Sequence, residues 1–129
     1  MSNSDNYLAG NLTSTSDVIM ELYVTLVDVW EIAEDQACAL LRLKPGDLSL
    51  ISNKSMQFDS DQLERAGYLL SIDAILSDIF TGDQKRVWLR SRDTTTNFGG
   101  NTILEKLLSG RVRDLYDVEA WLKGRIDLL

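Results

Sequence analysis

Residues 59–80, DSDQLERAGYLLSIDAILSDIF, carry the strongest structural pattern of the chain. Apolar side chains recur every three or four positions over about six turns, while most of the charged ones fall on the other side. Asp59 or Ser60 offers a side chain that can cap the first turn, and a turn over residues 81–83 is expected to end the helix. The apolar positions are Leu63, Ala66, Leu69, Leu70, Ile72, Ile75, Leu76, Ile79 and Phe80. The stretch predicts a long amphipathic helix at the centre of the fold.

Shorter elements are predicted before this helix. A helical spacing of apolar residues runs from Ser16 to Trp30, although the β-branched residues among them leave a strand as the rival interpretation. Glu34–Leu41 predicts a short helix, and Pro45 is suited to the first turn of another one that reaches about Ile51. Residues 1–16 are rich in Ser, Asn and Thr and are expected to form a frayed tail.

Three more short helices are predicted after the central one. The first runs from about Asp83 to Ser91, with Val87, Trp88 and Leu89 packing inward. A loop over residues 92–100 separates it from helices at 101–108 and 113–123. Because no segment alternates like a strand, we predict an all-α fold with a tail (1–16), a helical region (17–58) and a C-terminal domain (59–129).

Composition excludes much of enzyme chemistry. The 129 residues include no histidine and a single cysteine, Cys38, which we expect to be a small buried filler. Zinc sites of the Cys/His type, Ser-His-Asp triads and imidazole acid–base catalysis are therefore ruled out. Asp114 and Asp117 are interpreted as solvated helix acids, not as a catalytic pair or metal ligands. No catalytic residue, metal ligand or cofactor is predicted.

Location and charge limit the choice of partner. The first ten residues, MSNSDNYLAG, lack a basic and apolar leader, and no apolar run approaches the roughly 18 residues of a spanning helix, so a cytoplasmic protein without membrane contact is expected. Residues 1–83 hold 14 acidic and 4 basic side chains, whereas residues 84–129 hold 6 acidic and 9 basic ones. The front two thirds should therefore repel nucleic acid.

Residues 34–51 have the layout of a helix-turn-helix, and residues 30–44 resemble repressors of the Xre type. In this resemblance Cys38 fills the position of a small residue and Arg42 replaces a turn glycine. The candidates for DNA contact are Arg42, Lys44 and Ser49. The second helix, however, contains an acid and no Arg, Gln or Asn that could read base edges. A packed hairpin that has kept the shape without the contacts is the alternative.

The C-terminal part contains an ordered set of motifs. Trp88-Leu89 is followed by a polar linker, by Phe98-Gly99-Gly100, by a leucine-bearing short helix, by Ser109-Gly110 and by a final helix with Trp121-Leu122. This order resembles the toxin-binding domain of the Xre/MbcA/ParS antitoxin family, over about residues 17–129. The resemblance implies a non-catalytic antitoxin whose partner is a RES-domain toxin, an enzyme that consumes NAD or modifies a target with its ADP-ribose.

The same resemblance implies where the partner binds. The segment from Phe98 to Leu129 would dock over the toxin and keep NAD out of its pocket. Either a basic side chain or the C-terminal carboxylate would enter that pocket. The candidate partner-binding residues are Phe98, Gly99, Gly100, Asn101, Leu104, Leu108, Arg111, Arg113, Trp121, Lys123, Arg125 and Leu129. A homodimer is also implied, with Trp30 and the first helix as its candidate surface. A transcriptional regulator acting through residues 34–51, alone or together with the toxin, is the alternative function.

Overall fold

The computed structural model describes residues 3–53, 55–92 and 100–127, with side chains placed from residue 15 to residue 125. These residues form an all-α fold, as predicted. Its helices are α1 (Asn3–Trp30), α2 (Glu34–Leu41), α3 (Asp47–Ser52), α4 (Ser60–Ile79), α5 (Gly82–Leu89), α6 (Ile103–Leu107) and α7 (Val112–Asp127). Within the described residues, the β-type pairing is an isolated antiparallel bridge between Arg92 and Thr102. None of the described helices is both long and apolar enough to cross a membrane.

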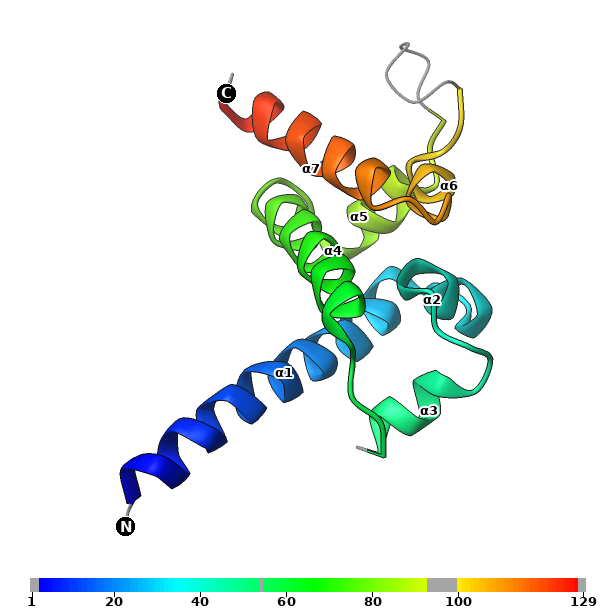
Figure 1. The fold of residues 1–129 in the computed structure, drawn as a ribbon. Helices are drawn as coiled ribbons and strands as arrows, with labels where there is room; N and C mark the ends of the chain where they lie inside the picture. Colours follow the sequence, from blue (N-terminus) through cyan, green and yellow to red (C-terminus); the bar gives the residue numbers. More distant parts are fainter. Residues whose placement is uncertain (1–2, 54, 93–99, 128–129) are drawn as a thin grey trace.

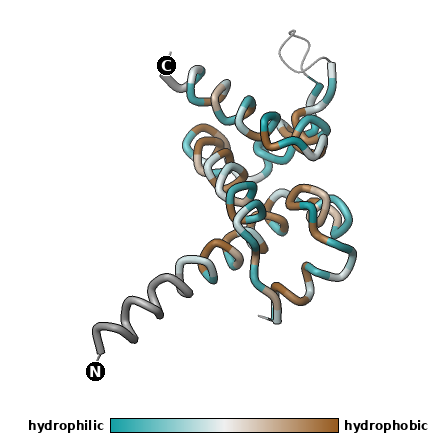
Figure 2. The backbone as a smooth tube through the Cα atoms, in the orientation of Figure 1, coloured by the Kyte–Doolittle hydropathy of each residue, from teal (hydrophilic) through white to brown (hydrophobic). Residues whose placement is uncertain are grey.

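The central helix α4 organises the fold (Figure 1). It packs against α1 on one side and against α7 on the other. Helix α3 packs against α1, and α2 packs against α3 and α4. Helix α6 packs against α7, and α5 packs against α1, α4 and α6. Figure 2 shows hydrophobic and hydrophilic residues alternating along α4. Because α4 packs against neighbours on two sides, its apolar residues do not form the single stripe of an amphipathic helix, and this part of the prediction was wrong. The predicted central helix is confirmed to within one residue at each end.

Reciprocal capping boxes define the start of several helices. Asp59 accepts a hydrogen bond from the backbone N–H of Gln62 at 2.8 Å, and the Gln62 side chain accepts one from the N–H of Asp59 at 2.9 Å. Thr81 and Gln84 form the same arrangement before α5. Each box satisfies backbone donors that a helix start leaves without partners. The local sequence therefore determines where these helices begin.

Some predicted boundaries were wrong. The backbone is already helical at Asn3, within the expected tail, because a helix that has nucleated extends at little cost per residue. Gly46, with φ of 89°, is the N-cap of α3, which leaves Pro45 outside that helix. Gly82 is the first residue of α5 and does not cap α4, whose C-cap is Phe80 in an extended conformation. The rival strand over the end of α1 is excluded by its helical backbone.

A continuous hydrophobic core includes residues of each helix. Tyr23 and Trp30 of α1 are fully buried, and the Tyr23 hydroxyl donates a hydrogen bond to the carbonyl oxygen of Ala37 at 2.6 Å. The Tyr23 ring also meets the ring of Phe58 edge-on. Cys38 is buried, as predicted, and burial raises the pKa of its thiol. The front and back parts of the chain therefore share one core through α1 and α4.

Candidate partner-binding site

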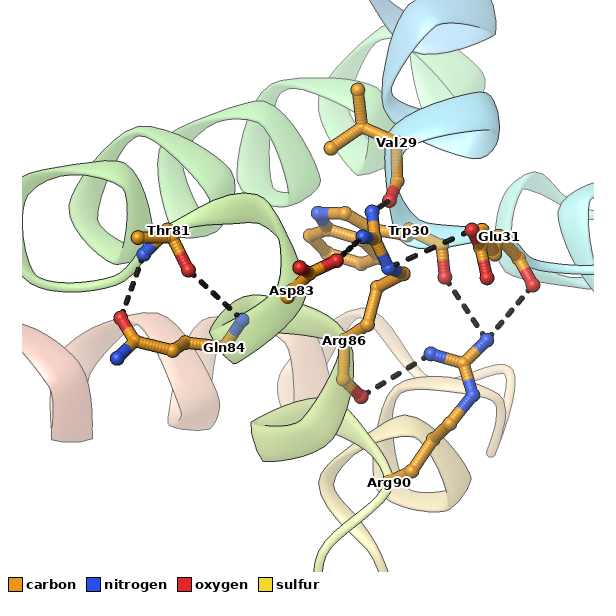
Figure 3. Close-up of polar contacts among 8 residues, drawn as sticks. All are labelled: Val29, Trp30, Glu31, Thr81, Asp83, Gln84, Arg86 and Arg90. Atoms are coloured by element: carbon orange, nitrogen blue, oxygen red, sulfur yellow. Dashed lines mark hydrogen bonds and ion pairs between the residues drawn. The ribbon is translucent and has the colours of Figure 1, made fainter.

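Helix α5 is attached to the end of α1 by two arginines (Figure 3). Arg86 Nη1 donates a hydrogen bond to the carbonyl oxygen of Val29 at 2.8 Å. Arg90 Nη2 donates to the carbonyl oxygens of Trp30 at 2.9 Å and of Glu31 at 2.8 Å. The last carbonyls of a helix have no partner within the helix, and α1 has no basic residue in its last turn. The arginines of α5 supply the donors and the positive charge that α1 lacks.

A partly buried polar contact lies beneath this junction. Asp73 of α4 accepts hydrogen bonds at Oδ1 from the Trp30 indole at 2.8 Å and from Lys85 Nζ at 2.9 Å, and Lys85 also donates to Ser77 Oγ at 2.9 Å. The Lys85 side chain is only 9% exposed. The expectation that Trp30 lies on a dimer surface is therefore wrong, because its ring is fully buried and its N–H is bound inside the chain.

This attachment leaves one face of α5 open to solvent. Val87 is 68% exposed, so the prediction that it packs inward was wrong. Successive residues of a helix point about 100° apart, and of residues 87–89 it is Leu89 that enters the core. Val87 lies between two hollows, of about 370 and 610 Å³. The first hollow has a mainly apolar surface. Its lining residues are Phe80, Asp83, Gln84, Val87, Trp88 and Ser91.

An aromatic cluster joins α5 to α7. The rings of Trp88 and Trp121 are stacked, with centroids 6.2 Å apart and planes inclined by 23°. The ring centroids of Phe80 and Trp88 lie 6.4 Å apart, and the guanidinium carbon of Arg125 lies 4.7 Å from the ring centroid of Trp121. Tryptophans 33 positions apart thus contribute to one surface next to Val87. We call Phe80, Val87, Trp88, Trp121 and Arg125 the α5–α7 surface.

The short helix α6 has an ordered start beside this surface. Gly100 has φ of 79°, in the left-handed region that favours glycine. Asn101 is exposed, and Thr102 caps α6 in a box with Glu105. Leu104 is buried in the core, where it anchors α6, and it is therefore not accessible to a partner. Leu108 is half-buried against the core. The expectations for Phe98, Gly99 and Leu129 fall outside the described residues.

The other predicted partner-binding residues are basic and exposed. Arg111 pairs with Asp114 at 3.2 Å, Arg113 approaches Asp117 at 4.0 Å, and Lys123 pairs with Glu119 at 3.3 Å. The acidic partner lies three or four positions away in each pair. The exposed Arg113–Asp117 pair contributes little to stability and can be exchanged for another carboxylate, whereas the acids that Arg111 and Lys123 contact are largely buried. Together with Arg125, these basic residues place exposed cationic groups on α7 and just before it, where an acidic partner can contact them.

Asp114 differs from its predicted role as a solvated acid. Its carboxylate is buried and accepts hydrogen bonds from Lys106 at 3.0 Å, from Ser109 and from Arg111 at 3.2 Å. Burial by itself raises the pKa of Asp114, but the bonds from Ser109 and Lys106 and the nearby positive charges outweigh it, so the pKa lies below its usual range. Asp114 therefore fixes the turn between α6 and α7.

The helix-turn-helix candidates lie on the far side of α4 from α7. Arg42 occupies the C-cap of α2 with φ of 57°, the conformation in which a glycine is common. Lys44 and Ser49 are exposed, and the backbone N–H of Lys44 donates to the side chain of Asp47. An acidic side chain thus lies at the start of the helix that would read DNA. Among the described residues, no cluster of acidic or sulfur ligands could hold a metal ion.

Comparison with known proteins identifies a distant relative. No protein-family model matches the chain. A curated protein of Sinorhizobium fredii (strain NBRC 101917 / NGR234), described as the uncharacterized protein y4oB, is 29% identical over 109 residues. The aligned segment spans 82% of each of the two chains. The similarity thus extends over most of the chain, and the relative's description assigns no activity.

Proposed function

We propose that this chain is a cytoplasmic, non-catalytic antitoxin of a type II toxin–antitoxin pair. Its C-terminal unit, composed of α5, α6 and α7, binds a RES-domain toxin and keeps NAD out of the toxin's pocket. The identity of the toxin rests on the resemblance of the ordered C-terminal motifs to the Xre/MbcA/ParS antitoxin family. A homodimer within the toxin complex is part of the proposal, with its interface away from the buried Trp30.

The observation that carries this proposal is the α5–α7 surface. It brings Trp88 of the first tryptophan-leucine motif onto Trp121 of the second. The exposed Val87 and the neighbouring apolar hollow provide area that a partner can bury. Aromatic and arginine side chains are the residue types that contribute most energy to protein interfaces.

The charges of α7 suit a negatively charged rim around the toxin pocket. Arg111 and Arg113 are 76% and 85% exposed in their side chains. Arg113 forms only an exposed pair with Asp117, so exchanging that pair for a toxin carboxylate costs little, whereas Arg111 also bonds the buried Asp114. Electrostatic attraction of this kind raises the rate of association and orients the partner. Inhibition is then steric and needs no catalytic residue.

Co-expression with the open reading frame next to this gene tests the proposal. Growth and cellular NAD are measured with wild type, with Val87→Lys and with Arg111→Glu/Arg113→Glu. We expect the neighbour to arrest growth and lower NAD, wild type to restore both, and the two variants to restore them poorly. Val87→Lys should fold normally, because substitutions of exposed side chains usually change stability by no more than about 0.5 kcal/mol.

Matched variants on the other face control for surface charge. Leu50→Lys places the same new charge on an exposed apolar residue of α3, and Arg42→Glu/Lys44→Glu repeats the charge reversal near α2. Both controls should protect as well as wild type. A harmless neighbour would refute the antitoxin assignment. Full protection by Val87→Lys and Arg111→Glu/Arg113→Glu would refute binding through the C-terminal unit.

A further inference from the structure

Helix α1 exposes a row of side chains with the spacing of a coiled-coil seam. Val18 and Leu22 are each 49% exposed, which is unusual for neighbouring large apolar residues on one helix face. The exposed Thr15 and Thr25 and the half-buried Val29 continue the row at alternating intervals of three and four. The hydroxyl of Thr25 donates to the carbonyl oxygen of Glu21 at 3.1 Å, so its bond is made within the helix. We call these five residues the α1 seam.

One flank of the seam is acidic, and the other belongs to the core. Glu21 and Asp28, each exposed, immediately precede Leu22 and Val29 and line the open flank. On the opposite flank Ile19 is half-buried and Leu26 is buried in the chain's own core. Helix α1 contains no lysine or arginine, and the first basic residue of the whole chain is Arg42. A helix lying on the seam can therefore meet charged groups of α1 only on an acidic side.

We propose that the α1 seam binds an amphipathic helix of another protein that carries lysine or arginine beside its apolar stripe. Leu and Val of the seam would pack between the apolar residues of that helix, while its cations would face Glu21 and Asp28. The proposal is independent of the proposed antitoxin function, because it concerns α1 and not the α5–α7 surface.

Charge disfavours a second copy of this chain as the occupant. In an antiparallel pair, Glu21 and Asp28 would face the same acids of the other copy, and like charges across a seam are unfavourable. In a parallel pair, these acids would face Ile19 and Leu26 of the second copy, and both of those residues pack into the core of that copy. Neither orientation offers the acids a cation from α1. A basic helix places cations beside these acids in either orientation.

Designed peptides test the proposal without any natural partner. The first labelled peptide has three heptads, with leucine at the seam positions and lysine at both flanks. The second peptide has glutamate in place of the flanking lysines. The third peptide has the same composition as the first, but its leucines do not follow the helical spacing. Binding to the full chain is measured by fluorescence anisotropy at low and high salt. We expect only the first peptide to bind, and more weakly at high salt.

Two variants and one control locate the site. We expect Val18→Ser/Leu22→Ser and Glu21→Lys/Asp28→Lys each to weaken binding of the lysine peptide by on the order of tenfold. Glu64→Lys/Asp78→Lys makes the same change of charge at exposed positions of α4, and should weaken it by no more than about twofold. Circular dichroism establishes that each variant remains folded.

Several results would contradict the proposal. The α4 control could weaken binding as much as the seam variants do, or the peptide without helical spacing could bind as well as the lysine peptide. Either result would show that the peptide is attracted by the overall negative charge of the protein and not by the seam. Equal binding of the glutamate peptide would remove the role of charge. Sedimentation of wild type as a dimer that Val18→Ser/Leu22→Ser dissociates would assign the seam to a second copy. Each of these outcomes overturns the proposal, as does failure of all three peptides to bind.

Discussion

Trp30 and Asp73, 43 residues apart in the chain, are joined by a hydrogen bond in which the indole N–H donates to the carboxylate Oδ1 at 2.8 Å. The same oxygen accepts a bond from Lys85, so one carboxylate of α4 holds the end of α1 and the start of α5 together. The two arginines of α5 then reach the final carbonyls of α1. The face of α5 proposed to meet the toxin is thus positioned by a partly buried contact with the N-terminal half.

Removal of this carboxylate should destabilise the whole fold. Asp73→Ala leaves the buried Lys85 ammonium and the Trp30 N–H without their acceptor, and we expect a loss of about 3 kcal/mol in the free energy of unfolding. Urea denaturation measures it. Asp78→Ala, an exposed acid of the same helix, is the control and should change stability by less than about 0.5 kcal/mol. Equal effects of the two substitutions would contradict the anchoring role.

A glycine should fit better than arginine at the end of α2. Arg42 holds φ of 57°, a conformation that costs a residue with a side chain about 1 kcal/mol relative to glycine. Arg42→Gly is therefore expected to raise the midpoint of thermal unfolding. Arg42→Ala separates this effect from loss of the charge, because alanine retains the strain and should give no gain. A gain with alanine as large as that with glycine would show that the charge, and not the backbone, is unfavourable.

The buried Asp114 should make stability depend on pH. Its folded pKa is depressed, so its stabilising contribution is complete above the pKa of an unfolded aspartate, about 3.9, and is lost as pH falls through the lower folded value. At neutral pH we expect Asp114→Asn to cost about 2 kcal/mol. The difference between wild type and variant should vanish in acid, as followed by urea denaturation from pH 7 to pH 2. A constant difference across this range would contradict the mechanism.

Cys38 should resist thiol reagents in the folded protein. Its sulfur is buried, and burial together with the acids Glu34, Asp47 and Asp35 raises the thiol pKa, which lowers the fraction of reactive thiolate. We expect the reaction with a disulfide reagent at pH 8 to be slower than in denaturant by on the order of 100-fold. The absorbance of the released thiolate measures both rates. Comparable rates would indicate that α2 opens readily.

Several features could be predicted because they depend on neighbouring residues. The spacing of apolar residues and the Asp59 cap determine α4 to within one residue at each end. A threonine followed three positions later by a glutamate is the sequence signature of a capping box, and Thr102 forms one with Glu105 at the start of α6. The absence of histidine restricts the chemistry regardless of the fold. In each case the controlling interactions lie within a few positions of the chain.

The errors occurred where contacts between distant segments decide the outcome. Val87, Trp88 and Leu89 are equally apolar in sequence, but only the attachment of α5 to α1 determines which of them points outward. Lys85 belongs to the basic third of the chain, yet Asp73 and Ser77 of α4 hold it in the interior. Asp114 resembles a solvated helix acid until Lys106 is seen to approach it.

The sequence by itself determined the all-α class, the place of the central helix and the separation of acidic and basic parts, because periodicity, capping and charge are local or additive properties. The tertiary structure alone decided which apolar residues remain exposed. The stacking of Trp88 on Trp121 and the exposure of Val18 and Leu22 both depend on how helices pack. Burial is shared between segments distant in the chain, and no single stretch of sequence specifies it.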